Sequence, residues 1–485
     1  MLSEKNRILK NVIVVSLAFL LEFSAFSGIG NLQSTLNNDP ELGTIGTTSL
    51  AVIYGALIFS SVLLPTIVMD KLGLKKTLMF SLVFYVLYTV ANFYPSWYTL
   101  MPTAVLLGLA GAPLWSAKCA YVTTSAQNYA KITNESQEAV VTKFFGIFFA
   151  FFQLTQVVGN LISSLVLSDL TNTGISFEPV HNSSYISKTC GRYDCQNVDF
   201  NSEDSAKDPA LAYTLMGIYT GTGVCSILIL FFFLDDIEMT KSTSTQQAKS
   251  PKDLVFASMK HLWNDKRAQA IAFITMYSGF KQAFMTGDIT KSYISCPLGI
   301  SWIGFVLMAY GATDAICSLT FGRLSGMIGK NTARGFLIGL AIGLDMFLCT
   351  ALLLWDPQPV VNGATSWLPF FWIPMFYGMS DAVIQTQINA IYGAFFPDNQ
   401  DAAFSCYRLF ESIGFIFPFA YQGLLCIDVK LYIQICVLMV SAVAYVICEG
   451  LEFERVNKYE QLQEKKSDEV VRKTSSGSKN SGFQD

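Results

Sequence analysis

Residues 47–94 read TTSLAVIYGALIFSSVLLPTIVMDKLGLKKTLMFSLVFYVLYTVANFY. The stretch holds two apolar runs, 47–69 and 77–94, each near the roughly 20 residues that a helix needs to cross a bilayer. Between them lies a basic connector, Asp70-Lys71-Leu72-Gly73-Leu74-Lys75-Lys76, in which the glycine allows a tight reversal. The pattern predicts a helical hairpin that crosses a membrane twice.

Similar apolar runs recur along the rest of the chain. They lie near 11–30, 98–120, 144–168, 211–234, 268–287, 300–322, 335–355, 367–393, 403–425 and 431–449. The first follows Lys5, Arg7 and Lys10 in the manner of a signal peptide, but it has no convincing cleavage site, and we expect a retained helix. The sequence therefore predicts an all-α polytopic membrane protein with about twelve transmembrane helices.

The composition agrees with a membrane protein. Hydrophobic residues make up 52% of the 485 residues and charged residues only 14%, whereas soluble domains carry about 25% charged residues. The formal net charge of −4 argues against a nucleic-acid partner, which requires a basic face. With two histidines and no metal-ligand spacing, we expect neither a metal nor a cofactor. We also find no Walker loop, zinc motif or nucleophile elbow, so an enzyme is not expected.

Lysine and arginine are concentrated in alternate connectors, which predicts the orientation. The connectors with these residues include 70–76, 241–267 and 323–334, and the tail after 452 is also basic; 31–46, 95–97 and 356–366 contain none. Both termini are therefore expected in the cytoplasm. The loop 169–210 is then outside, where the sequon at Asn182 is accessible for glycosylation. Cys190 and Cys195 lie in the same loop, and we expect them to form a disulfide, the alternative being two free thiols.

Short motifs repeat between the two halves of the chain at nearly the same offset. Tyr54-Gly55-Ala56 recurs as Tyr310-Gly311-Ala312, and Phe23-Ser24-Ala25-Phe26 resembles Tyr277-Ser278-Gly279-Phe280. Two glycines also recur: Gly159 as Gly414 and, at a larger offset, Gly108 as Gly378. We expect two six-helix pseudo-repeats, 1–235 and 268–452, with a cytoplasmic linker 236–267 and a disordered cytoplasmic tail 453–485.

Two parallel six-helix halves are the plan of the major facilitator superfamily, and the connector at 70–76 resembles its loop signature. Asp70 is expected to cap or pair with a neighbouring helix end, and Lys71, Gly73 and Lys75 complete the motif. A second copy places Gly322, Arg323, Gly329 and Lys330 at the repeat offset, although Gly326 stands where the acid should be. The other interpretation of either connector alone is a basic turn that follows the positive-inside rule.

Charged and amide residues inside the apolar runs are candidate functional residues, because a charge in the bilayer is costly. They are Glu22, Lys118, Lys281, Asp314, Asp345, Asp381, Gln385, Asn389, Arg408 and Glu411. One interpretation is a lined central cavity in which Arg408 contacts an anion or exchanges partners with Asp381. The other is structural: polar groups that tie packed helices together, such as Arg408 and Glu411 within one helix.

Several longer strings resemble the unc-ninety-three ion-channel regulatory family within the major facilitator superfamily. They include residues 92–100, 112–117, 144–149 and 159–165 in the first half, and 312–315, 381–387 and 407–409 in the second. The resemblance covers residues 1–450 and implies a facilitator-like fold in the plasma membrane.

The resemblance implies an accessory subunit that regulates a two-pore-domain potassium channel. A secondary transporter of a small solute is the first alternative, because of the fold and the buried charges. A trafficking chaperone for membrane receptors, with an additional endosomal location, is the second. For that alternative, Tyr459-Glu460-Gln461-Leu462 in the tail fits a short sorting pattern that often matches by chance.

Overall fold

The structure is a computed structural model of the whole chain. It describes residues 4–36, 44–135, 137–167, 189–195, 209–237, 262–328, 330–357, 367–396 and 400–477. Every regular element in these ranges is helical, as the sequence predicts.

The first half contains six long helical segments. Its helices are α1 (Glu4–Leu36), α2 (Ile45–Ala91), α3 (Trp97–Thr133), α4 (Gln137–Leu167) and α6 (Pro209–Phe233). Helix α2 is interrupted at Gly73, whose φ of 74° is unsuited to residues with a side chain, and its two arms are separate antiparallel segments. The quoted stretch 47–94 is therefore a helical hairpin, as predicted.

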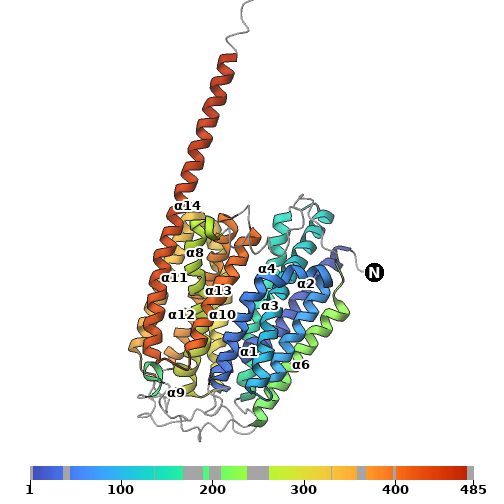
Figure 1. Cartoon of the computed structure of the whole chain (residues 1–485), viewed down its shortest axis with the longest axis vertical. Helices are drawn as coiled ribbons and strands as arrows, with labels where there is room; N and C mark the ends of the chain where they lie inside the picture. Colours follow the sequence, from blue (N-terminus) through green and yellow to red (C-terminus); the bar gives the residue numbers. More distant parts are fainter. Residues whose placement is uncertain are drawn as a thin grey trace, which may run out of the picture.

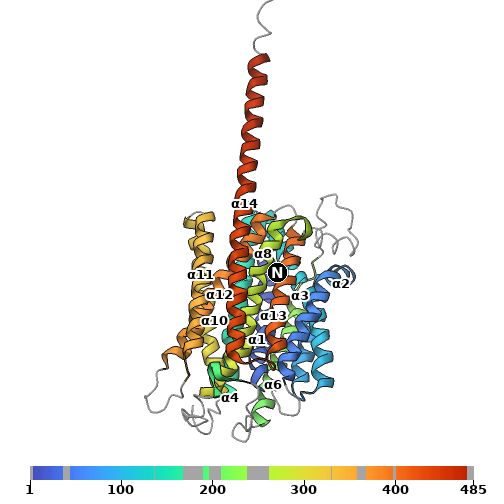
Figure 2. The same ribbon diagram turned by 60° about the vertical axis from the view of Figure 1, so that its left-hand side comes forward.

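The second half repeats the six segments. They are formed by α8 (Lys266–Phe284) continued by the π-helical η2 (Met285–Ser295), then α10 (Ser301–Ile328), α11 (Lys330–Leu354), α12 (Leu368–Phe395), α13 (Gln400–Tyr421) and α14 (Ile427–Gly477). The short elements α9 (Cys296–Leu298) and η1 (Gly191–Tyr193) lie in connectors. Figures 1 and 2 show all of the long helices as one bundle, from which α14 projects.

Within the described residues, seven helical segments are long and apolar enough to span a membrane by themselves. Shorter apolar helices run through Ile45–Ser61 and Trp302–Ser318. Helix α8 contains Lys281 and several other polar residues, which lower its hydropathy.

Two pairs of glycines confirm the internal repeat at atomic level. A Cβ on Gly159 of α4 would lie 2.2 Å from the carbonyl oxygen of Ser24, and a Cβ on Gly414 of α13 would lie 2.0 Å from that of Met276. The second pair, Gly108 and Gly378, approaches the backbones of α2 and α10 with equal closeness. Each half thus packs the corresponding helices backbone to backbone, where only glycine fits.

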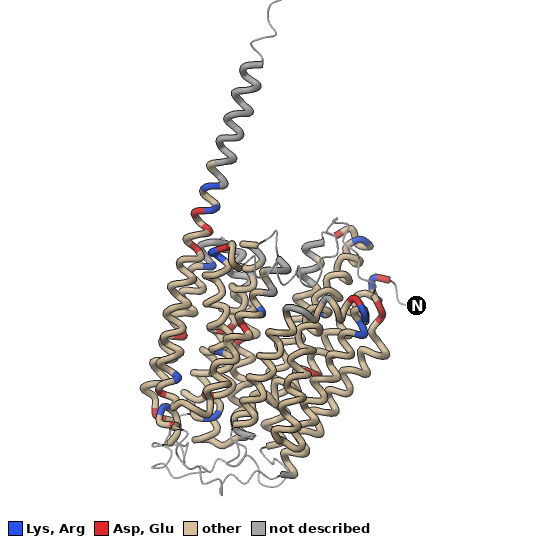
Figure 3. Tube along the Cα trace, in the orientation of Figure 1, with Lys and Arg blue, Asp and Glu red and all other residues tan. Residues whose placement is uncertain are grey.

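The bundle has two distinct ends. We call the end with the start of α1 and the projecting part of α14 the terminal face, and the opposite end, which carries η1, the loop face (Figure 1). In the tube of Figure 3, charged residues gather at both ends, and only a few lie within the bundle.

The apolar core is continuous between the halves near the loop face and divided near the terminal face. One large cluster includes Ile29 and Leu50 of the first half together with Ile289, Ile303 and Leu352 of the second. Towards the terminal face, the first half has a separate cluster around Val122 and Phe144 of α3 and α4. The second half has its own around residues of α8, α11, α12, α13 and α14. The halves are therefore joined most firmly at the loop face.

The tail differs from the expectation of disorder over part of its length. Helix α14 continues without interruption beyond Asn457 to Gly477. The sequence there is rich in Glu, Lys, Gln and Arg, which have high helix propensity and form stabilising pairs one turn apart. Low hydrophobicity predicted disorder, but it does not exclude a solvated helix.

A charged seam between two helical halves

The two halves meet where α4 packs on α10 and α2 packs on α13. The ring of Tyr54 stacks on that of Phe415 with centroids 4.2 Å apart, and the side chain of Gln156 lies against Gly311. Asn31 of α1 donates hydrogen bonds to Gln156 and to Asn160 of α4. These polar and aromatic side chains line what we call the seam.

Arg408 and Glu411 lie at the seam on α13, one turn apart. Nη1 of Arg408 is 2.7 Å from Oε2 of Glu411, which is the intrahelical pair that the spacing suggests. Glu411 is buried, whereas 46% of the Arg408 side chain is exposed. Arg408 also places its guanidinium carbon 5.3 Å from the centroid of the Trp115 ring in the other half. It therefore touches both halves.

Lys281 and Asp345 form a fully buried ion pair between α8 and α11. Nζ of Lys281 is 2.8 Å from Oδ1 of Asp345, and both side chains are 0% exposed. Tyr277 donates a hydrogen bond to the second oxygen of Asp345, and Lys281 lies 4.7 Å from the ring centroid of Tyr377. Every oxygen of the carboxylate is thus satisfied, which is the arrangement in which a buried pair is stable.

Asp381 and Asp314 occupy neighbouring helices, α12 and α10. Tyr310 donates a hydrogen bond to Oδ2 of Asp381, while Oδ1 has no hydrogen-bond partner among the described residues. Asp314 accepts a hydrogen bond from Ser318 of its own helix. Arg408, which sequence analysis considered as a partner of Asp381, is paired with Glu411 instead.

The expected polar stripe of α12 has divided roles. Gln385 donates to Ser278 of α8 and to Glu411 of α13, and it accepts a hydrogen bond from Tyr407. Asn389 is exposed and donates to the carbonyl oxygen of Gln385 in its own helix. Gln385 therefore ties three helices together, and the side chain of Asn389 also reaches that of Tyr407 on α13.

Two charged residues are buried in the first half without an opposite charge nearby. Oε2 of Glu22 accepts a hydrogen bond from Ser226 of α6, and Oε1 has no partner among the described residues. Lys118 of α3 is 2% exposed and surrounded by aromatic rings. In the described part of the chain, neither residue forms an ion pair.

The connector at 70–76 makes its contact through a different residue from the one expected. Asp70 and Lys71 are exposed, whereas Nζ of Lys75 donates to the carbonyl oxygens of Phe231 and Leu234 at the end of α6. A lysine at a helix C-terminus satisfies free carbonyls and opposes the helix dipole. The motif thus joins the first hairpin to α6.

For the second copy of the connector motif, only the backbone is described, and not at every position. Gly322 and Arg323 belong to the end of α10 and Lys330 begins α11, while Gly329 lies outside the described residues.

The disulfide expected between Cys190 and Cys195 is wrong. Cys190 is bonded to Cys296 and Cys195 to Cys426, so each has its partner in the second half. The segment between the first two cysteines forms η1 and lies along the loop face of the second half. Closeness in sequence does not decide the pairing, because this segment faces other helices instead of folding back on itself.

Polar contacts explain why the segment 189–195 lies there. Ser292 of η2 donates to Asp194, the backbone nitrogen of Ile427 donates to the carbonyl oxygen of Asp194, and Arg192 donates to that of Leu353. Near this segment, Lys430 and Asp288 form a second buried ion pair, in which Nζ of Lys430 is 2.7 Å from Oδ1 of Asp288. This pair was not among the predicted site residues, because Asp288 and Lys430 lie just outside the apolar runs 268–287 and 431–449.

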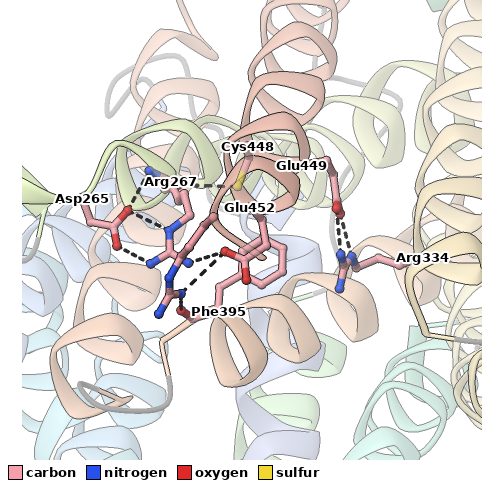
Figure 4. A network of polar contacts seen from close by, with 8 residues as sticks. Asp265, Arg267, Arg334, Phe395, Cys448, Glu449 and Glu452 are labelled. Atoms are coloured by element: carbon pink, nitrogen blue, oxygen red, sulfur yellow. Dashed lines mark hydrogen bonds and ion pairs between the residues drawn. The ribbon is translucent and has the colours of Figure 1, made fainter. Parts of the chain in front are cut away.

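Ion pairs at the terminal face were also missed. Figure 4 shows Arg334 with Glu449 and Arg267 with both Asp265 and Glu452, so α8 and α11 are fastened to α14. In the first half, Arg7 and Lys10 both pair with Asp235. The lysines and arginines of these segments served only to predict the orientation in the membrane, so their ion pairs were not among the predictions.

Two further candidate sites lie wholly or partly outside the described residues. Asn182 lies outside the described residues. Tyr459 and Leu462 belong to the backbone of α14, and their side chains are outside the described part.

The sequence matches the model of a known protein family and several of its relatives. The family model for "Ion channel regulatory protein UNC-93" matches residues 43–449. The unc-93 homolog A protein of Xenopus laevis is 43% identical over 451 residues, which are 92% of this chain and 94% of that protein. The Caenorhabditis elegans protein named "Putative potassium channel regulatory protein unc-93" is 31% identical over 94% of this chain and 62% of its own length.

Solved structures support the fold independently. The nucleoside transporter NupG superposes with a TM-score of 0.57 over 91% of this chain and 99% of its own, at 14% sequence identity. The major facilitator superfamily transporter FucP superposes with a TM-score of 0.55 at 14% identity, and identities this low show the fold alone. Taken with the match across residues 43–449, it shows that the chain is a multi-pass membrane protein with the major facilitator fold that belongs to the UNC-93 family.

Proposed function

We propose that this protein is an accessory subunit in the plasma membrane that regulates a potassium channel. The observation that supports this most directly is the relationship to the Caenorhabditis elegans protein, 31% identical over 94% of this chain, whose name describes potassium channel regulation. The family description refers to ion channel regulation as well.

The proposed orientation places the terminal face in the cytoplasm. Arg7, Lys10, Lys75, Arg267 and Arg334 all lie on that face, as the positive-inside rule favours. The loop face then meets the oxidising exterior, where disulfides such as Cys190–Cys296 persist. In the same orientation, Asn182 is exposed to the glycosylation machinery.

Co-expression with a channel tests the proposal. Two-pore-domain potassium channels are expressed in oocytes with and without this protein, and potassium current is compared at equal surface levels of channel, measured by biotinylation. We expect the current to change and the two proteins to co-purify. Unchanged current with every channel tried, while both partners are at the surface, would contradict the proposal.

A second function, secondary transport of a small solute, is favoured by the seam itself. Its amide, aromatic and charged side chains come from both halves, as a site that alternates between two sides of a membrane requires. Uptake into proteoliposomes that is lost in Arg408→Ala and in Asp381→Asn would support this function. Flat uptake across a broad panel of solutes would count against it.

A further inference from the structure

Lys118 is exceptional among the buried lysines of the described chain. Lys281 and Lys430 are each paired with an aspartate at less than 3 Å. Lys118 is just as deeply buried, at 2% exposure, yet no described carboxylate lies within ion-pair distance of it. A buried charge without an opposite charge is costly, so its presence requires an explanation.

Aromatic rings surround Lys118, and no described anion neutralises it. Its Nζ lies 4.4 Å from the ring centroid of Phe148 and 4.9 Å from that of Trp115, and the rings of Phe145 and Phe149 are also within 6 Å. Aromatic faces attract a cation through their quadrupoles. The thiol of neighbouring Cys119 is its polar contact.

A second cation reaches the same indole from the opposite half. The guanidinium carbon of Arg408 lies 5.3 Å from the Trp115 centroid, and the charges of Lys118 and Arg408 are close enough to repel each other. Glu411 neutralises only one of these two positive charges. The seam around Trp115 therefore has two described basic side chains and one described acidic side chain.

From these contacts we propose that the seam binds an anionic group, a carboxylate or a phosphate, between Lys118 of the first half and Arg408 of the second. The rest of the ligand lies against Trp115 and the exposed ring of Phe149, so an apolar or aromatic body suits the site. Such a ligand comes either from solution, as an organic anion, or from the bilayer, as an anionic lipid headgroup. Because its two contacts belong to different halves, binding favours the arrangement in which they are close.

The test uses the full chain in nanodiscs of phosphatidylcholine, with benzoate and phenyl phosphate as soluble probes and benzyl alcohol as a neutral one. Binding is measured by calorimetry and by the midpoint of thermal unfolding. A second arm replaces part of the phosphatidylcholine with phosphatidylglycerol and adds no soluble probe. We expect either the soluble anions or the anionic lipid to raise the midpoint, and benzyl alcohol to leave it unchanged.

Lys118→Met is the diagnostic variant, and Lys131→Met is its matched control. Lys131 is an exposed lysine on the same helix. We expect Lys118→Met to weaken anion binding at least about tenfold, because one charge-assisted hydrogen bond is lost. Lys131→Met should bind the anion like the parent. Lys118→Arg, which keeps the charge, should retain part of the affinity.

The outcomes separate cleanly. A midpoint shift by soluble anion or by phosphatidylglycerol that disappears in Lys118→Met supports the site and identifies its source. The same shift in Lys118→Met as in the parent, or no shift in either arm, overturns it. If Lys118→Met does not fold, Arg408→Gln is measured in its place, and undiminished binding by that variant overturns the proposal equally.

Discussion

The two halves of this protein share one architecture but treat their buried lysines differently, although buried carboxylates without an ion pair to a described residue occur in both. In the second half, Lys281 is paired with Asp345 and Lys430 with Asp288. In the first half, neither Glu22 nor Lys118 forms an ion pair with a described residue. Backbone packing at Gly159 and Gly414 is nevertheless equivalent. Packing between helices is thus a property of the repeat, whereas the pairing of the buried lysines distinguishes the copies.

The difference shows which buried charges act as structural contacts. In a low-dielectric interior, removing one partner of a pair leaves the other uncompensated, whereas an unpaired charge has no partner to lose. We therefore expect substitutions at the paired residues to affect stability strongly and substitutions at Lys118 to affect it little.

The largest effect is expected from Asp345→Asn. The substitution leaves Lys281 buried without a counter-charge, and breaking a buried pair in this way costs about 3–5 kcal/mol. The midpoint of thermal unfolding in nanodiscs should fall steeply. The double variant Lys281→Met, Asp345→Leu should recover most of the loss, because neither charge remains. A single variant that melts like the parent would show that the pair does not stabilise the second half.

Loss of the loop-face disulfides comes next. The double variant Cys190→Ser, Cys195→Ser detaches the segment 189–195 from the second half, and a disulfide closing a long loop contributes about 2–4 kcal/mol. The midpoint of thermal unfolding of the variant should lie below that of the parent under oxidising conditions, and the two midpoints should agree under reducing conditions. Peptide mapping of the parent protein under non-reducing conditions should recover Cys190 with Cys296 and Cys195 with Cys426. A peptide that links Cys190 to Cys195 would refute this arrangement.

Gly159→Val and Gly414→Val test the feature that the halves have in common. Each added side chain meets a backbone carbonyl of the neighbouring helix, and overpacking of this kind costs about 1–3 kcal/mol. The two variants should destabilise the protein by similar amounts. Gly30→Val is the control, because a Cβ there meets nothing within 4 Å. Strongly unequal losses of stability in the two variants would contradict the claim that the two halves pack in an equivalent way.

The smallest effect is expected at the terminal face of the first half. Burial tends to raise the pKa of Asp235, but hydrogen bonds from Arg7, Asn11 and Lys10 outweigh it and lower the pKa below its ordinary value. The contribution of Asp235 to the free energy of unfolding is therefore fully present above the ordinary pKa of an aspartate. It is lost as the pH falls through the lowered pKa. Asp235→Asn should cost at most about 1 kcal/mol, less at high salt. A stability loss as large as that of Asp345→Asn would contradict the contrast between exposed and buried pairs.

Much of the fold follows from local features of the sequence. The apolar runs and the reversal at Gly73 can each be recognised from a few neighbouring residues. The recurrence of Gly159 as Gly414 can be recognised by comparing the two halves. Each of these features corresponds to an observed element or contact. The tail is the exception, because Glu and Lys favour a solvated helix as well as disorder.

The candidate site was predictable only in part, for a physical reason. The pair of Arg408 with Glu411 lies within one helix, so spacing alone reveals it. The partners of Lys281, Lys430, Cys190 and Cys195 lie on other helices, and sequence spacing contains no information about which helices are neighbours. The approach of Arg408 to Trp115 depends in addition on how the two halves are placed.

The most direct test of the contrast between the halves compares two lysines in one experiment. Lys281→Met and Lys118→Met are prepared in the same nanodiscs, and thermal unfolding is recorded without any added anion. Lys281→Met should be destabilised by about 3–5 kcal/mol, because Asp345 loses its counter-charge. Lys118→Met should be at least as stable as the parent, because an unpaired buried charge is replaced by an apolar chain of similar length. Equal destabilisation of both variants would contradict the claim that the first half holds a cation without a structural partner.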